Sequence, residues 1–323
     1  FNVLGAEAND EMMEISQRVS PKLSQTSNNI FLNEKLLARV KSIYDKKEQL
    51  NLSTEDAKLL EDLYESFKAN GATLNKDDKE KYRKLSMDLS MLTLQFDQNA
   101  LKDKNRFELL ITDENELSGL PESARDAAAM LAKSKDKNGW LFNLSAPSYI
   151  PFMRYSDKRD LREKMYREYM SVGNKGDEFD NKDIIKKIVN IRLEIAQLMG
   201  FKNYAEYALE HTMAKNSANV YKLLNQLLEA YKPIAINEYN AVEGFALGTE
   251  KENITVMPWD WSYYSEKLRD IRFKVNDEMT RPYFELSNVK KGVFGLATQL
   301  YGITFKENKK IPSRRASGLR KTR

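Results

Sequence analysis

The stretch NKDDKEKYRKLSMDLSMLTLQFDQNALKDK, at residues 75–104, decides the fold class of this chain. Its apolar side chains recur in steps of three and four residues, at Tyr82, Leu85, Leu89, Leu92 and Phe96. That spacing aligns them along one stripe of a helix. Asn75 is a suitable N-cap residue, and two aspartates follow it near the positive end of the helix dipole. The stretch therefore predicts a long helix that packs through one face.

The residues before this stretch show the same helical pattern. One apolar stripe lies within residues 36–44, and a second lies within 59–67, after Ser53 and Thr54. Gly71 is expected to end the second helix, since glycine is favoured just beyond a helix C-terminus. Residues 1–106 are accordingly predicted to form an N-terminal helical region of antiparallel helices with short polar connections.

The pattern changes in residues 107–156. The sequences FELLI (107–111) and WLFNL (140–144) are short and suited to strands, and residues 121–133 between them are an alanine-rich helix candidate. Pro147 and Pro151 are expected to impose an extended stretch. We predict a small two-stranded β ribbon near residues 107–144, followed by extended chain.

Helices are predicted again in residues 157–308. Ser156 is expected to cap one helix, and Asn181 another that runs to Leu198. The latter is apolar around much of its circumference, which predicts a central position. Ser217 opens a further helix that Pro233 should kink or interrupt. The chain is thus expected to be mainly α, a multi-helix lobe or lobes, with a basic tail at residues 309–323 that has a different composition.

The supply of metal-binding side chains is unusually small. The 323 residues include a single histidine, His211, and no cysteine. Structural and catalytic zinc sites rely mainly on imidazole and thiolate ligands, so this chain cannot build a His/Cys zinc site alone. Cys–His catalysis is excluded, and Ser–His catalysis could rest only on His211. We interpret His211 as a helix-terminal or surface residue. No metal ligand and no catalytic residue is expected in this chain.

The charge distribution argues against a broad nucleic-acid interface. The net charge is +4, yet residues 309–323 alone hold seven basic and no acidic side chains, which leaves 45 basic against 48 acidic elsewhere. The tail could contact phosphates, but a solvated chain end is favoured. No nucleic-acid partner is expected.

No apolar run reaches the length of a membrane span, so no membrane partner is expected either. No signal peptide is visible. A cytoplasmic location is expected, and a periplasmic one stays open because the chain starts at Phe1 without Met.

Two other groups of residues can each be interpreted in more than one way. The aromatic residues Trp259, Trp261, Tyr263 and Tyr264 could line a peptide-binding channel or anchor a helix to its neighbours, and we favour packing. Gly292 and Gly295 do not form a phosphate-binding motif. Because they lie within a helical stripe, close helix packing explains them better. Substrate-binding residues remain unknown from the sequence alone.

An ordered set of short motifs resembles one known protein family. They are LTLQFDQN (92–99), GLPE (119–122), PSYIPFM (147–153), YS (155–156), LREK (161–164), MAK (213–215), PWDWSYYSEKLR (258–269), RPYF (281–284), GVF (292–294) and LYGITF (300–305). In this order they resemble the thimet-oligopeptidase-like family of zinc metallopeptidases, most closely its bacterial peptidyl-dipeptidase (Dcp) branch. The resemblance covers about residues 1–311.

The resemblance implies a mainly helical, two-lobed enzyme whose deep channel admits short peptides. It also implies zinc held by the two histidines of H-E-x-x-H and a glutamate on a following helix. The Dcp branch releases dipeptides from substrate C-termini. The zinc helix of the family lies downstream of the region similar to residues 303–311, and no metal ligand or catalytic glutamate matches any position here. The chain is therefore expected to be a fragment that ends before the zinc-binding motif, and to bind no zinc itself.

Three hypotheses about function follow. The chain is the non-catalytic portion of a zinc metallopeptidase, supplying scaffold and channel wall and inactive alone. The alternative is a non-catalytic helical module that binds peptides or proteins. The third, nucleic-acid association through the tail, is disfavoured by the charge distribution. Under the first two, apolar faces left exposed predict self-association.

Overall fold

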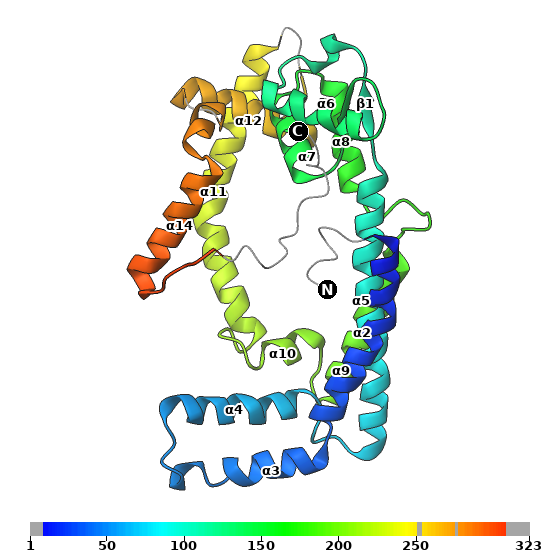
Figure 1. Cartoon of the computed structure of the whole chain (residues 1–323), viewed down its shortest axis with the longest axis vertical. Helices are drawn as coiled ribbons and strands as arrows, with labels where there is room; N and C mark the ends of the chain where they lie inside the picture. The colour runs from blue at the N-terminus through cyan, green and yellow to red at the C-terminus, as the bar shows by residue number, and fades with distance from the viewer. Residues whose placement is uncertain (1–8, 251–253, 275–276, 308–323) are drawn as a thin grey trace. The chain divides into compact units, whose positions relative to one another are not determined.

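The computed structural model describes residues 9–250, 254–274 and 277–307 (Figure 1). The fold is mainly α-helical with a small two-stranded antiparallel sheet, as predicted. The chain divides into two compact units, of which unit 1 comprises residues 1–106 and 171–234 and unit 2 comprises residues 107–170 and 235–323. None of the described helices combines the length and hydropathy needed to cross a bilayer. The predicted tail at 309–323 lies outside the described residues.

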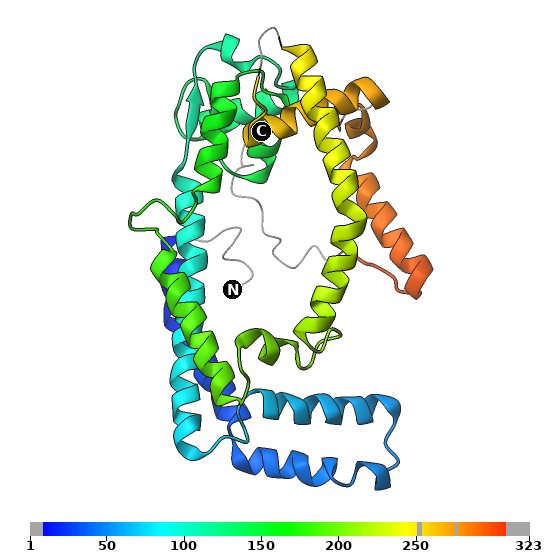
Figure 2. The same ribbon diagram turned by 180° about the vertical axis from the view of Figure 1, so that it is seen from behind.

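Unit 1 is built around one long helix, α5. Its elements are α2 (Asp10–Phe31), α3 (Glu34–Tyr44), η1 (Lys47–Gln49), α4 (Thr54–Ala69), α5 (Lys76–Arg106), α9 (Lys182–Leu198), α10 (Tyr204–Leu209) and the first part of α11 (Ser217–Thr249). Helices α2, α5 and α9 lie side by side, and α5 contacts both of the others (Figures 1 and 2). The Asn75 side chain accepts a hydrogen bond from the Asp78 amide at 2.9 Å, as predicted for the N-cap of α5.

The interface between α5 and α9 is apolar. Tyr82 and Leu85 of α5 and Ile195 of α9 are buried together with Leu32. The predicted stripe is therefore confirmed at these positions. The central position predicted for α9 is wrong, because the side chains of Ile185 and Val189 are exposed on it. Asn181 occupies the predicted N-cap position of α9, but its side chain makes no capping hydrogen bond; its side-chain amide instead donates to the Phe96 carbonyl at 3.1 Å.

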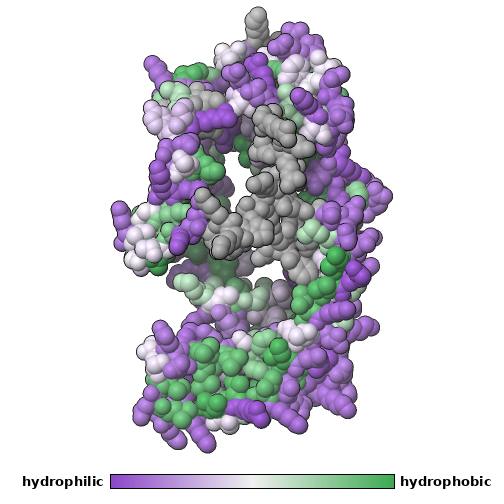
Figure 3. All heavy atoms as spheres, viewed as in Figure 1, coloured by the Kyte–Doolittle hydropathy of each residue, from purple (hydrophilic) through white to green (hydrophobic). Residues whose placement is uncertain are grey.

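The interface between α2 and α5 is polar. Gln17 donates to Gln98 at 2.6 Å, and Asn28 donates to Ser86 at 2.8 Å. Isolated buried amides are costly unless hydrogen-bonded, so these pairs fix how the two helices align. The apolar residues Ile15 and Leu23 of α2 are exposed instead. A similar excess of exposed apolar side chains covers the α3–α4 pair, where Figure 3 shows a continuous hydrophobic area.

Unit 2 begins with the predicted ribbon. Its elements are β1 (Leu109–Ile111), η2 (Glu114–Leu117), α6 (Glu122–Ser134), β2 (Trp140–Phe142), α7 (Ala146–Tyr155), α8 (Arg159–Met170), the rest of α11, α12 (Pro258–Phe273), α13 (Asp277–Thr280), η3 (Arg281–Tyr283) and α14 (Leu286–Tyr301). The strands β1 and β2 pair antiparallel with Leu110 opposite Leu141. Ile111 and Phe142 are almost fully buried, whereas Leu110 is exposed; a one-residue slip of β1 would bury Leu110 and expose Ile111, which fixes the register of this strand.

The extended stretch predicted at Pro147 and Pro151 is wrong. Both prolines lie in α7. The first of them is in the opening turn, where a backbone N–H would have no hydrogen-bond acceptor within the helix. Pro151 removes one internal hydrogen bond. Directly after it, Phe152 is fully buried and packs edge-to-face on Phe142 at 4.8 Å between ring centroids. The burial of this aromatic side chain compensates for the missing bond.

Candidate functional site

The densest polar arrangement in unit 2 joins α8 to the N-terminus of α12. Asp260 lies in the first turn of α12 and accepts a hydrogen bond from the Met257 amide at 3.1 Å, which caps the helix. Its carboxylate also receives the Arg162 guanidinium at 2.8 Å and the Arg159 guanidinium at 2.7 Å. Arg162 further donates to the Ser156 carbonyl at 2.7 Å. We call Ser156, Arg159, Arg162 and Asp260 the arginine–aspartate cluster.

The arginine–aspartate cluster is closed to solvent at its centre. The side chains of Arg162 and Asp260 are 1% and 0% exposed. Burial by itself raises the pKa of Asp260, but hydrogen bonds from Arg159, Met257 and Arg162 lower the pKa below its usual value. Asp260 is therefore ionised at neutral pH and paired with buried positive charge. Such a pair holds helices in one arrangement, but it offers no free group to a substrate.

A second polar group adjoins the arginine–aspartate cluster. The Asp157 carboxylate accepts hydrogen bonds from the Tyr263 hydroxyl at 2.7 Å, from Ser118 at 2.6 Å and from Lys267 at 3.3 Å. The Arg162 guanidinium lies 4.0 Å above the centre of the Tyr263 ring, a cation–π contact. Burial and then Asp157 raise the pKa of Tyr263, so its hydroxyl stays protonated and remains a donor at neutral pH.

Acid should weaken unit 2 through Asp157. Burial raises the pKa of Asp157, but hydrogen bonds from Ser118, Tyr263 and Lys267 outweigh it and hold the pKa below its ordinary value of 3.8. A carboxyl with a lowered pKa stabilises the fold above the unfolded-state pKa and loses that contribution as pH falls through the folded-state pKa. We expect the free energy of unfolding to fall as pH drops below about 3.8, and Asp157→Asn to show a shallower fall. Urea titrations at several pH values measure this pH dependence of the free energy of unfolding.

Asp160→Asn, at a neighbouring exposed position, is the matched control and should show the same pH dependence as wild type. A wild-type pH dependence in Asp157→Asn would contradict the assignment.

The aromatic residues singled out in the sequence separate into two groups. Trp259, Tyr263 and Tyr264 are buried, so the packing interpretation is confirmed for them. The side chain of Trp261 is 37% exposed and stacks on Tyr239 of α11 with 5.8 Å between ring centroids. It borders a groove of about 230 Å³ between α11 and α12. Trp261 is therefore the one member of this group that a ligand could reach.

His211 lies on the surface, as predicted. It follows α10, and its side chain is 43% exposed. Its Nε2 atom is 3.4 Å from a carboxylate oxygen of Glu210 and 3.9 Å from one of Glu65. In the described part of the chain, no group of three or more His, Cys, Asp or Glu side chains could hold a metal ion. The residues present therefore do not fit the zinc site that the resemblance implies for the family.

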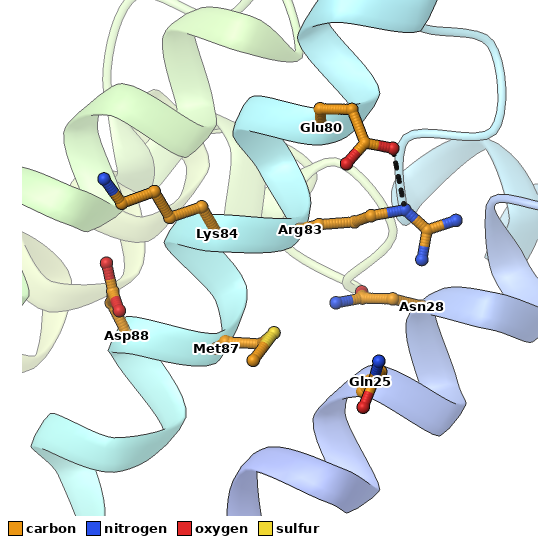
Figure 4. Close-up of a pocket in the computed structure, with 7 residues that line it drawn as sticks. All are labelled: Gln25, Asn28, Glu80, Arg83, Lys84, Met87 and Asp88. Carbon is orange, nitrogen blue, oxygen red and sulfur yellow. Dashed lines mark ion pairs between the residues drawn. The ribbon is translucent and has the colours of Figure 1, made fainter.

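Hollows are also present in the described part of unit 1. One of about 340 Å³ lies between α2 and α5 and is lined by seven residues (Figure 4), namely Gln25, Asn28, Glu80, Arg83, Lys84, Met87 and Asp88. The Arg83 guanidinium and the Glu80 carboxylate on its wall are 3.5 Å apart. The acidic and basic side chains that line it are typical of a solvated helix surface. It contains no nucleophile paired with a base.

Sequence alone did not predict the arginine–aspartate cluster as a unit. In the sequence, Arg162 and Asp260 belong to two separate family motifs and are 98 residues apart. A signal was present: Arg159 and Arg162 share one helix face, and Asp260 occupies a capping position between two tryptophans. Sequence spacing alone could not show that these two faces meet.

Comparison with known proteins is consistent with this architecture. Residues 152–317 match Peptidase family M3. The chain is 34% identical over 304 residues to Oligopeptidase A of Salmonella typhimurium, covering 92% of the chain and 44% of that relative. It is 32% identical over 314 residues to Dipeptidyl carboxypeptidase of Escherichia coli, covering 97% and 46%. It is 34% identical over 303 residues to Probable cytosolic oligopeptidase A of Arabidopsis thaliana, covering 91% and 43%.

These matches show a metallopeptidase fold family, as the motifs predicted. The chain belongs to peptidase family M3. The relatives include both oligopeptidases and a dipeptidyl carboxypeptidase. The chain spans less than half the length of the curated relatives it matches.

Proposed function

We propose that this chain is the non-catalytic portion of a zinc metallopeptidase that hydrolyses short peptides, and that it forms scaffold and channel wall. One observation carries the proposal. Residues 152–317 match an M3 peptidase, yet the whole sequence has one histidine and no cysteine. The chain thus combines the family's fold with too few ligands for the family's metal. In this proposal residues 1–106, 107–156 and 157–308 all contribute framework.

The framework role is supported by what the buried polar groups do. The arginine–aspartate cluster, through buried contacts, and Asp157, through partly exposed ones, hold α12 against α7 and α8. None of these groups is a free acid, base or nucleophile. Zinc and its catalytic glutamate would come from a part of the M3 fold that does not match any residues here. A cytoplasmic place of action is proposed with it, supported by the name of the Arabidopsis relative.

The purified chain should bind no stoichiometric zinc and release no products from short peptides. The reason is the single, surface-exposed imidazole at His211, since a zinc site takes about four ligands. Metal analysis after dialysis, together with mass spectrometry of peptide digests, measures both quantities. Stoichiometric zinc accompanied by zinc-dependent hydrolysis would falsify the proposal. His211→Ala is the control for adventitious binding and should leave both readings unchanged.

The alternative is a non-catalytic helical module that binds peptides. Its specific support is the exposed Trp261–Tyr239 stack beside the groove between α11 and α12. Tight binding of short peptides to the isolated chain, lost in Trp261→Ala and unaccompanied by cleavage, would favour this alternative over the scaffold proposal.

A further inference from the structure

The sequence contains the dipeptide Asn–Gly twice, at Asn70–Gly71 and at Asn138–Gly139. Asn–Gly is prone to spontaneous deamidation, because glycine has no side chain to shield its backbone nitrogen or restrict its rotation. That nitrogen can attack the side-chain carbonyl carbon of the asparagine. A new N–Cγ bond forms, the Cγ–Nδ2 bond breaks, and ammonia leaves with the amide proton to give a five-membered succinimide. Water then opens the ring to aspartate or isoaspartate, so the reaction needs no oxidant and no cofactor.

The first pair is held at the end of a helix. Asn70 is the C-cap residue of α4, and its side-chain amide donates to the Ser66 carbonyl at 2.8 Å. The Gly71 amide, which would have to attack, donates to the Lys68 carbonyl at 3.0 Å. Asn70 is also partly buried. Both hydrogen bonds must open before the ring can close, so the folded state protects this pair.

The second pair lies in the connection between α6 and β2, where no such restraint is present. Asn138 is exposed. Within the described part of the chain, neither its side chain nor the Gly139 amide takes part in a hydrogen bond. The attacking nitrogen and the carbon that it attacks are therefore accessible in the folded state.

The backbone at Gly139 requires glycine and so preserves the reactive pair. Gly139 has φ +112°, and a Cβ atom there would lie 2.3 Å from the Ile111 carbonyl oxygen. Any other residue would be strained and would collide with the backbone of β1. The fold thus keeps a glycine directly after the exposed Asn138.

We propose that Asn138–Gly139 is a site of spontaneous succinimide formation in the folded chain, and that its isoaspartate product loosens the ribbon of β1 and β2. Isoaspartate carries the main chain through the former side chain and so adds one methylene to the backbone. The addition falls two residues before Trp140, which pairs with Ile111, and beside the close approach of Gly139 to Ile111. The reaction needs only this chain and water, so it is independent of the proposed scaffold function.

Ageing the full chain in mildly alkaline buffer at physiological temperature tests the proposal. Trypsin cleaves between the two pairs, so mass spectrometry reads each pair in its own peptide. Digestion at mildly acidic pH suppresses further deamidation, because the attacking amide then keeps its proton. In the folded chain we expect Asn138 to be converted at least about tenfold faster than Asn70, whose hydrogen bonds must first open. In guanidinium, where neither pair is held, the two should react at similar rates.

Two variants separate the sites. Asn138→Gln should abolish conversion at this position, because glutamine would have to close a six-membered ring, which forms far more slowly. Asn70→Gln is the matched control and should leave conversion of Asn138 unchanged. Hydrogen exchange of the β1 and β2 amides should become faster in aged wild type and stay unchanged in aged Asn138→Gln.

Either half of the proposal can fail separately. Equal rates at the two pairs in the folded chain, faster conversion of Asn70, or an unreactive Asn138 in a chain that reacts when denatured would overturn the site. Unchanged exchange of the ribbon amides in the isoaspartate form would overturn its structural consequence.

Discussion

Replacing Arg162 by methionine is expected to lower the free energy of unfolding of unit 2 by about 3–5 kcal/mol. The substitution keeps most of the side chain's volume but leaves the buried Asp260 carboxylate with only Arg159 as a charged partner. It also removes the donors that satisfy the carbonyls of Ser156 and Trp259. Chemical denaturation followed by hydrogen exchange in α8 and α12 measures the loss and assigns it to unit 2.

A control variant and a double variant test this expectation further. Lys164→Met, two residues along the same helix at an exposed position, should change stability by less than about 0.5 kcal/mol. Combining R162M with D260L should cost less than the sum of the two single changes, because neither charge is then left unpaired. A loss in Arg162→Met no larger than in Lys164→Met would show that the arginine–aspartate cluster contributes little to the fold.

Gly119→Ala is the second change with a large expected effect, about 2–5 kcal/mol of destabilisation. Gly119 has φ +83°, a conformation that costs an L-residue about 1–2 kcal/mol. A Cβ atom there would lie 2.1 Å from the Tyr155 carbonyl oxygen and 2.8 Å from the Asp157 carboxyl carbon. Backbone would have to move, which adds about 1–3 kcal/mol of overpacking and disturbs the Ser118–Asp157 hydrogen bonds.

Gly176→Ala separates the two contributions. Gly176 has φ +72° but open space around the position of a Cβ atom, so only the backbone strain applies. We expect a loss of about 1–2 kcal/mol there. Thermal or urea unfolding of both variants measures the difference. Equal losses in the two variants would mean that the close contact at Gly119 relaxes freely.

The sequence predicted the elements better than it predicted their partners. The three-and-four spacing around Tyr82 and Leu85 identified α5 because helix periodicity is a local property. The strands β1 and β2 were predicted correctly because the sequence pattern of a strand is also a local property. The α7 helix was missed because proline is a local signal, while the burial of Phe152 that outweighs it is a tertiary effect.

The tertiary contacts of the candidate site were even harder to predict from the sequence. Asn181 looks like a helix cap in the sequence, yet its side chain bonds the α5 backbone 85 residues away. Arg162 and Asp260 meet only when α8 and α12 pack. By contrast, the expectation that the chain cannot form a His/Cys zinc site by itself needed no fold at all, since it follows from a count of histidine and cysteine.

The interleaved order of the two units has a consequence for how the chain is made. Helix α5 is synthesised early, but its apolar partner α9 emerges only after residues 107–181 have left the ribosome. Until then the stripe containing Tyr82 and Leu85 has no native cover on that side. Nascent chains paused in this interval should therefore be the forms that chaperones engage most strongly.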